Sequence, residues 1–275
     1  MNRAIYGLVL KDLRLNQHYS LNDLVNNYFY AERLLFIDIK MKASNNYFVI
    51  VPAAGVGNRM KIDLPKQYIS INGKKILEYT LTTLLSYPRF KKCVVVINKK
   101  DPYWSGLQFN SPHLLTVLGG EERCHSVFNG LMALETIAKK NDWILVHDAA
   151  RPLLHRSDID KLITHLDEHP VGGLLGHPIK NTVKQFNNER FETLDRKKLW
   201  AAVTPQMFRY HWLVDALNAA IKKNQFTADE SNAIELFGQQ PKMVEGREDN
   251  IKITDKGDLN LLDYYLSIRP DLYAS

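Results

Sequence analysis

Short runs of apolar residues alternate with amphipathic stretches from residue 47 onward. The runs at 47–52, 92–98 and 143–146 have the length and character of buried strands. Strands of a parallel sheet are covered on both faces and therefore appear as continuous apolar runs. A shorter strand end is expected at 116–120, and helical spacing is found at 76–87, 126–140 and 157–165, the second helix being capped by Ser126. This alternation predicts an α/β fold with a mostly parallel sheet.

The rhythm changes after Val171. Short β-like pieces and polar turns follow one another there without a strong helical period, which predicts an excursion from the sheet, a β-arm at about 178–200. Regular structure then returns, with helices expected at 210–223, 231–237 and 257–268 and strands at 242–246 and 250–254.

The first 46 residues do not fit this pattern. They lack a long apolar segment followed by a small-residue cleavage site, and they carry acidic residues, so they do not resemble a signal or transit peptide. We interpret residues 1–46 as an extension of unknown role or the product of an upstream start, with Met41 as a plausible initiator. Residues 47–275 are then expected to form one domain.

Composition narrows the possible environments. The chain has 275 residues, 45% of them hydrophobic, which is enough for one sizeable core. Its two cysteines, Cys93 and Cys124, cannot form a disulfide framework, so a reducing cytoplasmic compartment is expected. No apolar run reaches the roughly 18 residues of a membrane span. The net charge of +6 is compatible with a nucleic-acid binder, but the lysines are scattered and have no helix-turn-helix or RNP-like context, and a polyphosphate substrate explains the excess equally well.

The strongest chemical signal is the segment VPAAGVGNRMKIDLPKQY at 51–68. A glycine-rich turn directly after a strand exposes backbone N–H groups to an anion, and Gly55 and Gly57 allow close approach. The spacing matches neither the dinucleotide-binding motif nor a Walker A loop. Two permanent cations follow instead, Arg59 and Lys66, and such cations stabilise the charge that develops during nucleotidyl transfer. The alternative is a tight turn beside solvated cations.

A second motif, VHDAARP at 146–152, ends a buried strand. A carboxylate at the carboxyl end of such a strand points into the crevice where α/β proteins bind ligands, so Asp148 is predicted to hold a divalent cation, Mg²⁺ being the expected ion. Arg151 is a candidate phosphate contact, and His147 is interpreted as a packed residue. The alternative for Asp148 is a turn or helix-cap role.

Two weaker motifs complete the set. In VEGREDNIKIT, at 244–254, Asp249 is a candidate second metal ligand and Lys252 a further phosphate cation, although a charge run is more often a solvated face. In GGEERCHSV, at 119–127, Gly120 and Ser126 are suited to contacting a base, whereas Cys124 is expected to be inert.

Together these motifs resemble the 2-C-methyl-D-erythritol 4-phosphate cytidylyltransferase family, from about residue 48 to residue 265. The resemblance implies a Rossmann-like, GT-A-type nucleotidyltransferase fold. It places Arg59 and Lys66 at the catalytic positions, Asp148 at the metal and Lys252 beside the nucleotide. The remaining residues that it implies around the nucleotide are Ala53, Ala54, Gly55, Gly120 and Ser126.

The resemblance also gives the arm a role. It implies a homodimer in which Thr182 and Arg196 reach the neighbouring subunit's site and hold the acceptor phosphate, with Thr204 near the substrate. Two positions depart from the family pattern: Glu121 stands where many members have Asp, and Ala228 where a Thr often precedes the Asp-Glu pair. The first position bears on base recognition, and the second on a substrate hydroxyl contact, for which neighbouring Thr227 is the substitute.

The expected activity is therefore transfer of CMP from CTP to methylerythritol phosphate. Two alternatives stay open at this point. A ribitol 5-phosphate cytidylyltransferase would share the nucleotide motifs and differ in its acceptor, and a regulator would bind the nucleotide without catalysis.

Overall fold

The computed structural model describes residues 45–55, 64–187 and 190–268. The chain divides into two units, residues 1–45 and 46–275, and the helices, strands and pocket described below lie in the second. Residues 1–44 of the predicted extension and the predicted catalytic Arg59 lie outside the described residues.

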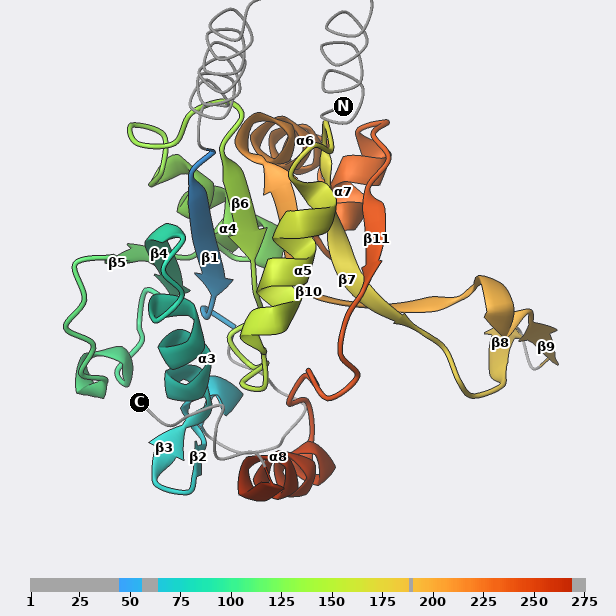
Figure 1. Cartoon of the computed structure of the whole chain (residues 1–275), viewed down its shortest axis with the longest axis horizontal. Helices are drawn as coiled ribbons and strands as arrows, with labels where there is room; N and C mark the ends of the chain where they lie inside the picture. The colour runs from blue at the N-terminus through green and yellow to red at the C-terminus, as the bar shows by residue number, and fades with distance from the viewer. Residues whose placement is uncertain (1–44, 56–63, 188–189, 269–275) are drawn as a thin grey trace, which may run out of the picture. The chain divides into compact units, whose positions relative to one another are not determined.

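A seven-stranded sheet forms the centre of this unit, in the order β11-β7-β10-β6-β1-β4-β5 (Figure 1). Strand β10 runs antiparallel to both its neighbours, whereas the pairings of β1 with β4, β1 with β6, β4 with β5 and β7 with β11 are parallel. The predicted, mostly parallel α/β sheet is confirmed. Its strands are β1 (Tyr47–Pro52), β4 (Phe90–Ile97), β5 (Leu114–Leu118), β6 (Trp143–Val146), β7 (Gly172–Pro178), β10 (Trp200–Arg209) and β11 (Lys242–Glu245).

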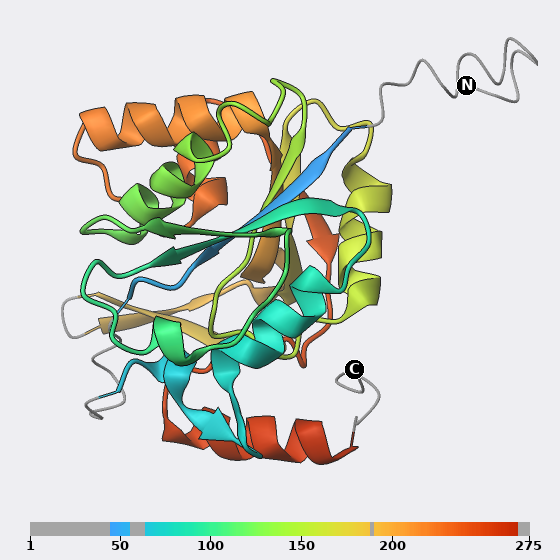
Figure 2. The ribbon, with the colours of Figure 1, turned by 90° about the vertical axis from the view of Figure 1, so that its left-hand side faces the viewer.

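Helices cover both faces of the sheet (Figure 2). Strand β1 shows why, because its successive side chains point to opposite faces: Val49 packs with the cluster that includes α3 and α5 residues, and Ile50 packs with residues of α4, α6 and α7. Both faces of the strand are therefore dry, as its continuous apolar run predicts. The helices are α3 (Ile76–Leu85), α4 (Arg123–Met132), α5 (Arg156–Leu166), α6 (Tyr210–Lys222), α7 (Glu230–Leu236) and α8 (Lys256–Ile268).

A third apolar cluster ties the end of the chain to the sheet's carboxyl edge. Leu262 of α8 and Ile253 pack there with Ile76 and Ala150, beside the small hairpin of β2 (Ser70–Ile71) and β3 (Lys74–Lys75). The N–H of Ile253 donates to the carbonyl of Ala150 at 2.9 Å. Lys252 is thereby held next to the segment that follows β6.

Two local expectations were wrong. Helix α4 begins at Arg123 rather than Ser126, its N-cap is Glu122, and it ends at Met132 instead of continuing to residue 140. Residues 250–254 form no strand, because their backbone bonds to the loop after β6 instead of extending a sheet ladder.

The predicted excursion after Val171 is confirmed only between β7 and β10, where the chain forms a protruding arm (Figure 1). Strands β7 and β10 themselves belong to the central sheet. The arm's strands β8 (Val183–Asn187) and β9 (Arg190–Leu194) pair only with each other in the described sheets. Phe186 and Phe191 face one another in this pairing and are 71% and 66% exposed. Among the described helices, none is long and apolar enough to cross a membrane.

Candidate active site

A pocket opens at the carboxyl ends of β1 and β6. It brings together predicted residues from four separate segments, and Arg123, which the sequence did not single out, also lines it. The predicted residues on its wall are Ala53, Ala54, Gly55, Lys66, Gly120, Ser126, Asp148 and Lys252.

One side of the pocket is the loop that leads into α4. A Cβ on Gly119 would lie 2.6 Å from the Cβ of Ala54, and a Cβ on Gly120 would lie 2.4 Å from that of His125. Such distances exclude any side chain without a shift of the backbone, so both glycines are required for this close approach. Ser126 lies inside the helix, where its hydroxyl accepts from the Gly120 N–H at 3.2 Å. The loop is therefore fixed before any ligand arrives.

Another part of the pocket wall is the turn after β1. Its carbonyls are held by amide side chains: Gln67 donates to Ala53 at 2.7 Å and to Gly55 at 3.0 Å, and Asn98 donates to Ala54 at 3.2 Å. Gln67 belongs to the short 3-10 helix η2 (Lys66–Tyr68). The same residues that fix the turn thus place Lys66 on the pocket wall.

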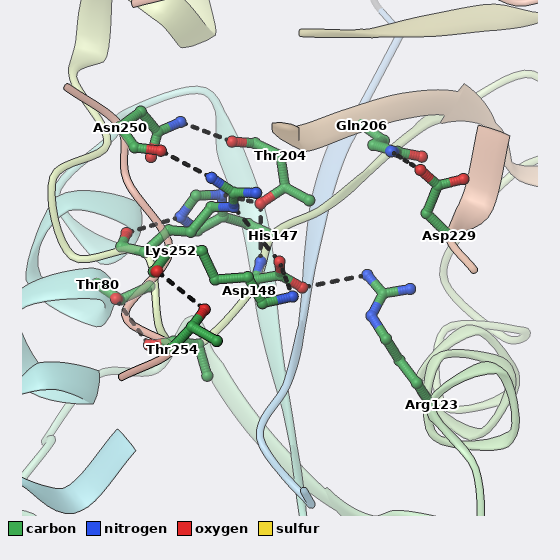
Figure 3. Close-up of polar contacts among 12 residues, drawn as sticks. Thr80, Arg123, His147, Asp148, Thr204, Gln206, Asp229, Asn250, Lys252 and Thr254 are labelled. Carbon is green, nitrogen blue, oxygen red and sulfur yellow. Dashed lines mark hydrogen bonds and ion pairs between the residues drawn. The ribbon is translucent and has the colours of Figure 1, made fainter. Parts of the chain in front are cut away.

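Asp148 lies on the pocket wall and is 7% exposed. Figure 3 shows Arg123 and Lys252 converging on its carboxylate. Lys252 Nζ is 2.8 Å away, Arg123 Nη2 3.3 Å and Arg151 Nε 3.4 Å. Burial alone would raise the pKa of this carboxyl, but the three cations outweigh burial and hold the pKa well below its ordinary value. Asp148 is therefore ionised at neutral pH.

A chain of hydrogen bonds anchors the backbone of Asp148, and the contacts determine which group donates and which accepts in each bond. The Asp148 N–H donates to the Thr204 hydroxyl at 3.1 Å, and this hydroxyl lies 3.0 Å from His147 Nδ1. His147 Nε2 lies 3.1 Å from the Arg151 carbonyl, which can only accept, so the proton sits on Nε2 and Nδ1 accepts from Thr204. His147 is fully buried and belongs to this framework, consistent with its interpretation as a packed residue.

Several predicted ligand contacts have partners within the chain. Arg151 is 8% exposed and donates to the Asn250 carbonyl at 2.8 Å, in addition to its contact with Asp148. The Asp249 carboxylate accepts two hydrogen bonds from Arg247, at 2.9 and 2.5 Å. Thr204 is 4% exposed. Arg151 and Thr204 contact Asp148 without lining the pocket, and Asp249 does not line it either. The direct roles of all three toward ligands stay predictions.

The two arm residues lie apart from this wall. Thr182 and Arg196 are exposed, and neither lines the pocket. Arg196 belongs to the 3-10 helix η4 (Arg196–Lys198) and donates to the carbonyl of Lys180, two residues before Thr182. The predicted pair therefore gathers at the base of the arm.

Arg123 and Glu230 are the site residues that sequence reasoning missed. Arg123 bonds to Glu230, which is 0% exposed, as well as to Asp148. Arg123 stands in the motif GGEERCHSV and Glu230 in the segment TADE. The only sequence signal was a pair of opposite charges 107 residues apart, which spacing alone does not connect.

The residues fit a divalent cation that arrives with phosphates. In the described part of the chain no three His, Cys, Asp or Glu residues are grouped as a complete metal site. Mg²⁺ is commonly bound by one or two carboxylates together with substrate phosphates, and Asp148 supplies one ionised carboxylate on the pocket wall.

His147 predicts how stability depends on pH. Burial lowers its pKa to about 4, whereas the unfolded side chain titrates at about 6.5. Between these values the unfolded chain binds the proton and the folded chain does not. Stability from this group is therefore complete above pH 6.5 and lost as the pH falls toward 4, by up to about 3 kcal/mol. Urea denaturation at pH 7.0, 5.5 and 4.5 measures this loss.

The matched variant for this measurement is His147→Gln. It should show a smaller loss over the same interval, because the titrating group is gone, while His169, whose pKa burial also lowers, contributes equally to both proteins. Equal losses in the two proteins would contradict the assignment.

Comparisons with known proteins agree with this geometry. The family model for 2-C-methyl-D-erythritol 4-phosphate cytidylyltransferase matches residues 47–268. A protein of that name from Aliivibrio fischeri is 48% identical over 220 residues, 79% of this chain and 92% of the relative. One from Haemophilus influenzae is 45% identical over 226 residues, 82% of this chain and 98% of the relative.

A solved structure leads to the same family. The crystal structure of the Francisella tularensis 2-C-methyl-D-erythritol 4-phosphate cytidylyltransferase superposes with a TM-score of 0.71 at 36% identity, covering 80% of this chain and 99% of that one. Sequence motifs, fold and pocket thus converge, and the chain belongs to the 2-C-methyl-D-erythritol 4-phosphate cytidylyltransferase family.

Proposed function

We propose that the chain transfers CMP from CTP to 2-C-methyl-D-erythritol 4-phosphate and releases pyrophosphate, as a step in isoprenoid precursor synthesis. The observation that supports this most directly is the pocket itself. A glycine loop without room for side chains faces Lys66, Lys252 and Arg123 around one ionised carboxylate. Such a site suits a nucleotide, with the nucleobase at one end and the polyphosphate at the other.

The reaction needs aligned substrates and preplaced positive charge, and it needs no general base. A phosphate monoester has its second pKa at about 6, so the acceptor is already mostly a dianion at neutral pH. One of its oxygens forms a bond to the α-phosphorus of CTP while the bond from that phosphorus to the pyrophosphate oxygen breaks. Lys66, with Arg59, would stabilise the negative charge on the α-phosphate and on the leaving group.

Asp148 is the residue that would hold Mg²⁺ together with the triphosphate. The bound cation would neutralise phosphate charge. Lys252 contacts the same carboxylate at 2.8 Å, so an ion there would release its ammonium group toward the phosphates. Asp249 is a weaker candidate ligand because it does not line the pocket, whereas Asp148 does.

The defining assay is pyrophosphate release from CTP and Mg²⁺ with either methylerythritol 4-phosphate or ribitol 5-phosphate as acceptor. Release with the first acceptor alone is expected. A preference for ribitol 5-phosphate would move the protein to the alternative activity, and CTP binding without release from either acceptor would indicate a non-catalytic regulator.

Lys66→Ala should lower kcat by roughly 10²- to 10³-fold, because a preplaced cation that stabilises transition-state charge is lost. The melting temperature should change little, since Lys66 lies on the pocket wall and only partly in the core. Lys222→Ala, which removes an exposed lysine at the end of α6, is the control. A near-normal kcat in Lys66→Ala would rule out the catalytic role.

The arm supports a homodimer. Two-stranded hairpins are marginally stable alone in water, and exposed apolar groups on a projecting element mark an interaction surface. Phe186 and Phe191 form such a surface, and Thr182 and Arg196 at the arm base lie outside the pocket of their own chain. We infer that the arm packs on a second copy and completes that copy's acceptor site.

Mixing Lys66→Ala with Arg196→Ala protein tests shared sites. Each variant alone should be nearly inactive, but a mixed dimer has one site with an intact Lys66 and the partner's intact Arg196. Random exchange makes half the dimers mixed, each with one intact site of two, so recovery of about a quarter of wild-type activity is expected. No recovery in heterodimers verified by differential tags would argue against crossing arms.

A further inference from the structure

The buried pair of Arg123 and Glu230 joins two helices at the pocket. Arg123 is the first residue of α4 and Glu230 the first of α7. Their contact is bidentate, with Arg123 Nη1 2.5 Å from Glu230 Oε1 and Nη2 3.0 Å from Oε2. Glu230 is 0% exposed, whereas the Arg123 side chain keeps 28% of its surface accessible. The Glu230 carboxylate is buried and does not line the pocket, whereas Arg123 does.

Glu230 is itself held rigidly. The preceding residue, Asp229, caps α7 and accepts from Gln206 Nε2 at 3.0 Å, and the N–H of Ser231 donates to Gln206 Oε1 at 2.8 Å. Gln206 belongs to β10 and is buried in the sheet. Figure 3 shows this anchor on the same side of the site as Arg123. The position of the Glu230 carboxylate is thus fixed by the central sheet.

The guanidinium has capacity left for a ligand. Among the described residues, Glu230 and Asp148 take up three of its five N–H donors. Burial acts to lower the pKa of Arg123, but the two carboxylates outweigh burial and raise it above its ordinary value, so the charge is permanent. Three cations, Arg123, Arg151 and Lys252, surround two carboxylates, Asp148 and Glu230, which leaves this cluster with a net charge of +1.

We infer that Glu230 is a positioning residue for nucleotide binding, which holds the Arg123 guanidinium between the glycine loop and Asp148 so that its remaining N–H donors bind the phosphate chain of CTP. The inference rests on the proposed function. It identifies a cation beyond Arg59, Lys66 and Lys252 and explains why a fully buried acid lies at the start of α7.

The test is a calorimetric titration of CTP with Mg²⁺, without acceptor, into Glu230→Gln. The amide offers one acceptor instead of two and no charge, so the guanidinium is no longer fixed. The Kd for CTP should rise roughly ten- to hundredfold, the effect of losing a charge-assisted hydrogen bond. Glu235→Gln removes an exposed carboxylate from the same helix and should leave the Kd unchanged. An unchanged Kd in Glu230→Gln, or an equal rise in both variants, would overturn the inference.

A double-variant cycle separates positioning from general stability. If Glu230 acts through Arg123, then Arg123→Gln/Glu230→Gln should bind CTP no more weakly than Arg123→Gln alone. The double variant buries no unpaired charge and should therefore fold better than either single variant. If the double variant instead loses affinity by the product of the two single-variant factors, Glu230 acts independently of Arg123, and the inference is overturned.

The outcome remains decisive if Glu230→Gln does not fold. Glu230→Asp keeps the charge but draws the carboxylate back from Arg123, and it should raise the Kd in the same direction; an unchanged Kd in this variant overturns the inference. Failure of the proposed function is seen separately, because it would appear in the wild-type protein as absent pyrophosphate release with both acceptors.

Discussion

The ionised carboxylate of Asp148 is the interaction on which the site depends. It sits at the end of β6, in the middle of the sheet, and Arg123, Arg151 and Lys252 reach it from three different parts of the chain. Burying a carboxylate without partners is strongly unfavourable. The fold therefore has to place these cations beside Asp148. As a result, the start of α4 and the segment before α8 lie together at the end of β6.

The supporting contacts follow from the same requirement. The Thr204 hydroxyl fixes the Asp148 backbone, and His147 orients that hydroxyl from within the core. Asn250 donates to the Thr204 carbonyl at 2.7 Å and accepts from Arg151 through its own carbonyl. These groups remove the freedom that ligand binding would otherwise have to suppress. A site for nucleotidyl transfer benefits from this, because its rate depends on alignment and preplaced charge.

Sequence alone predicted those parts whose determinants are local. The runs 47–52 and 143–146 are strands because they are apolar on both faces. Local reasoning failed where distant contacts decide. Ser126 has the chemistry of a helix cap, but its hydroxyl serves Gly120 from inside α4, and Glu122 caps the helix instead. Residues 250–254 have strand-like composition, but their partner is the loop after β6. Arg123 forms an ion pair with Glu230, and Arg247 forms one with Asp249. No local sequence pattern distinguishes these partners from the other charged residues of the chain.

The two halves of the proposed reaction are built with different rigidity. The nucleotide half is formed by loops that the sheet holds, with glycines at positions where even a Cβ would collide. Thr182 and Arg196, the residues proposed to hold the acceptor, sit at the base of a hairpin that has no sheet neighbour among the described strands and whose phenylalanines are exposed. A hairpin of this kind gains order when another surface covers it. If the arm completes a neighbouring site, acceptor recognition depends on dimerisation, whereas the nucleotide pocket is built from residues of one chain.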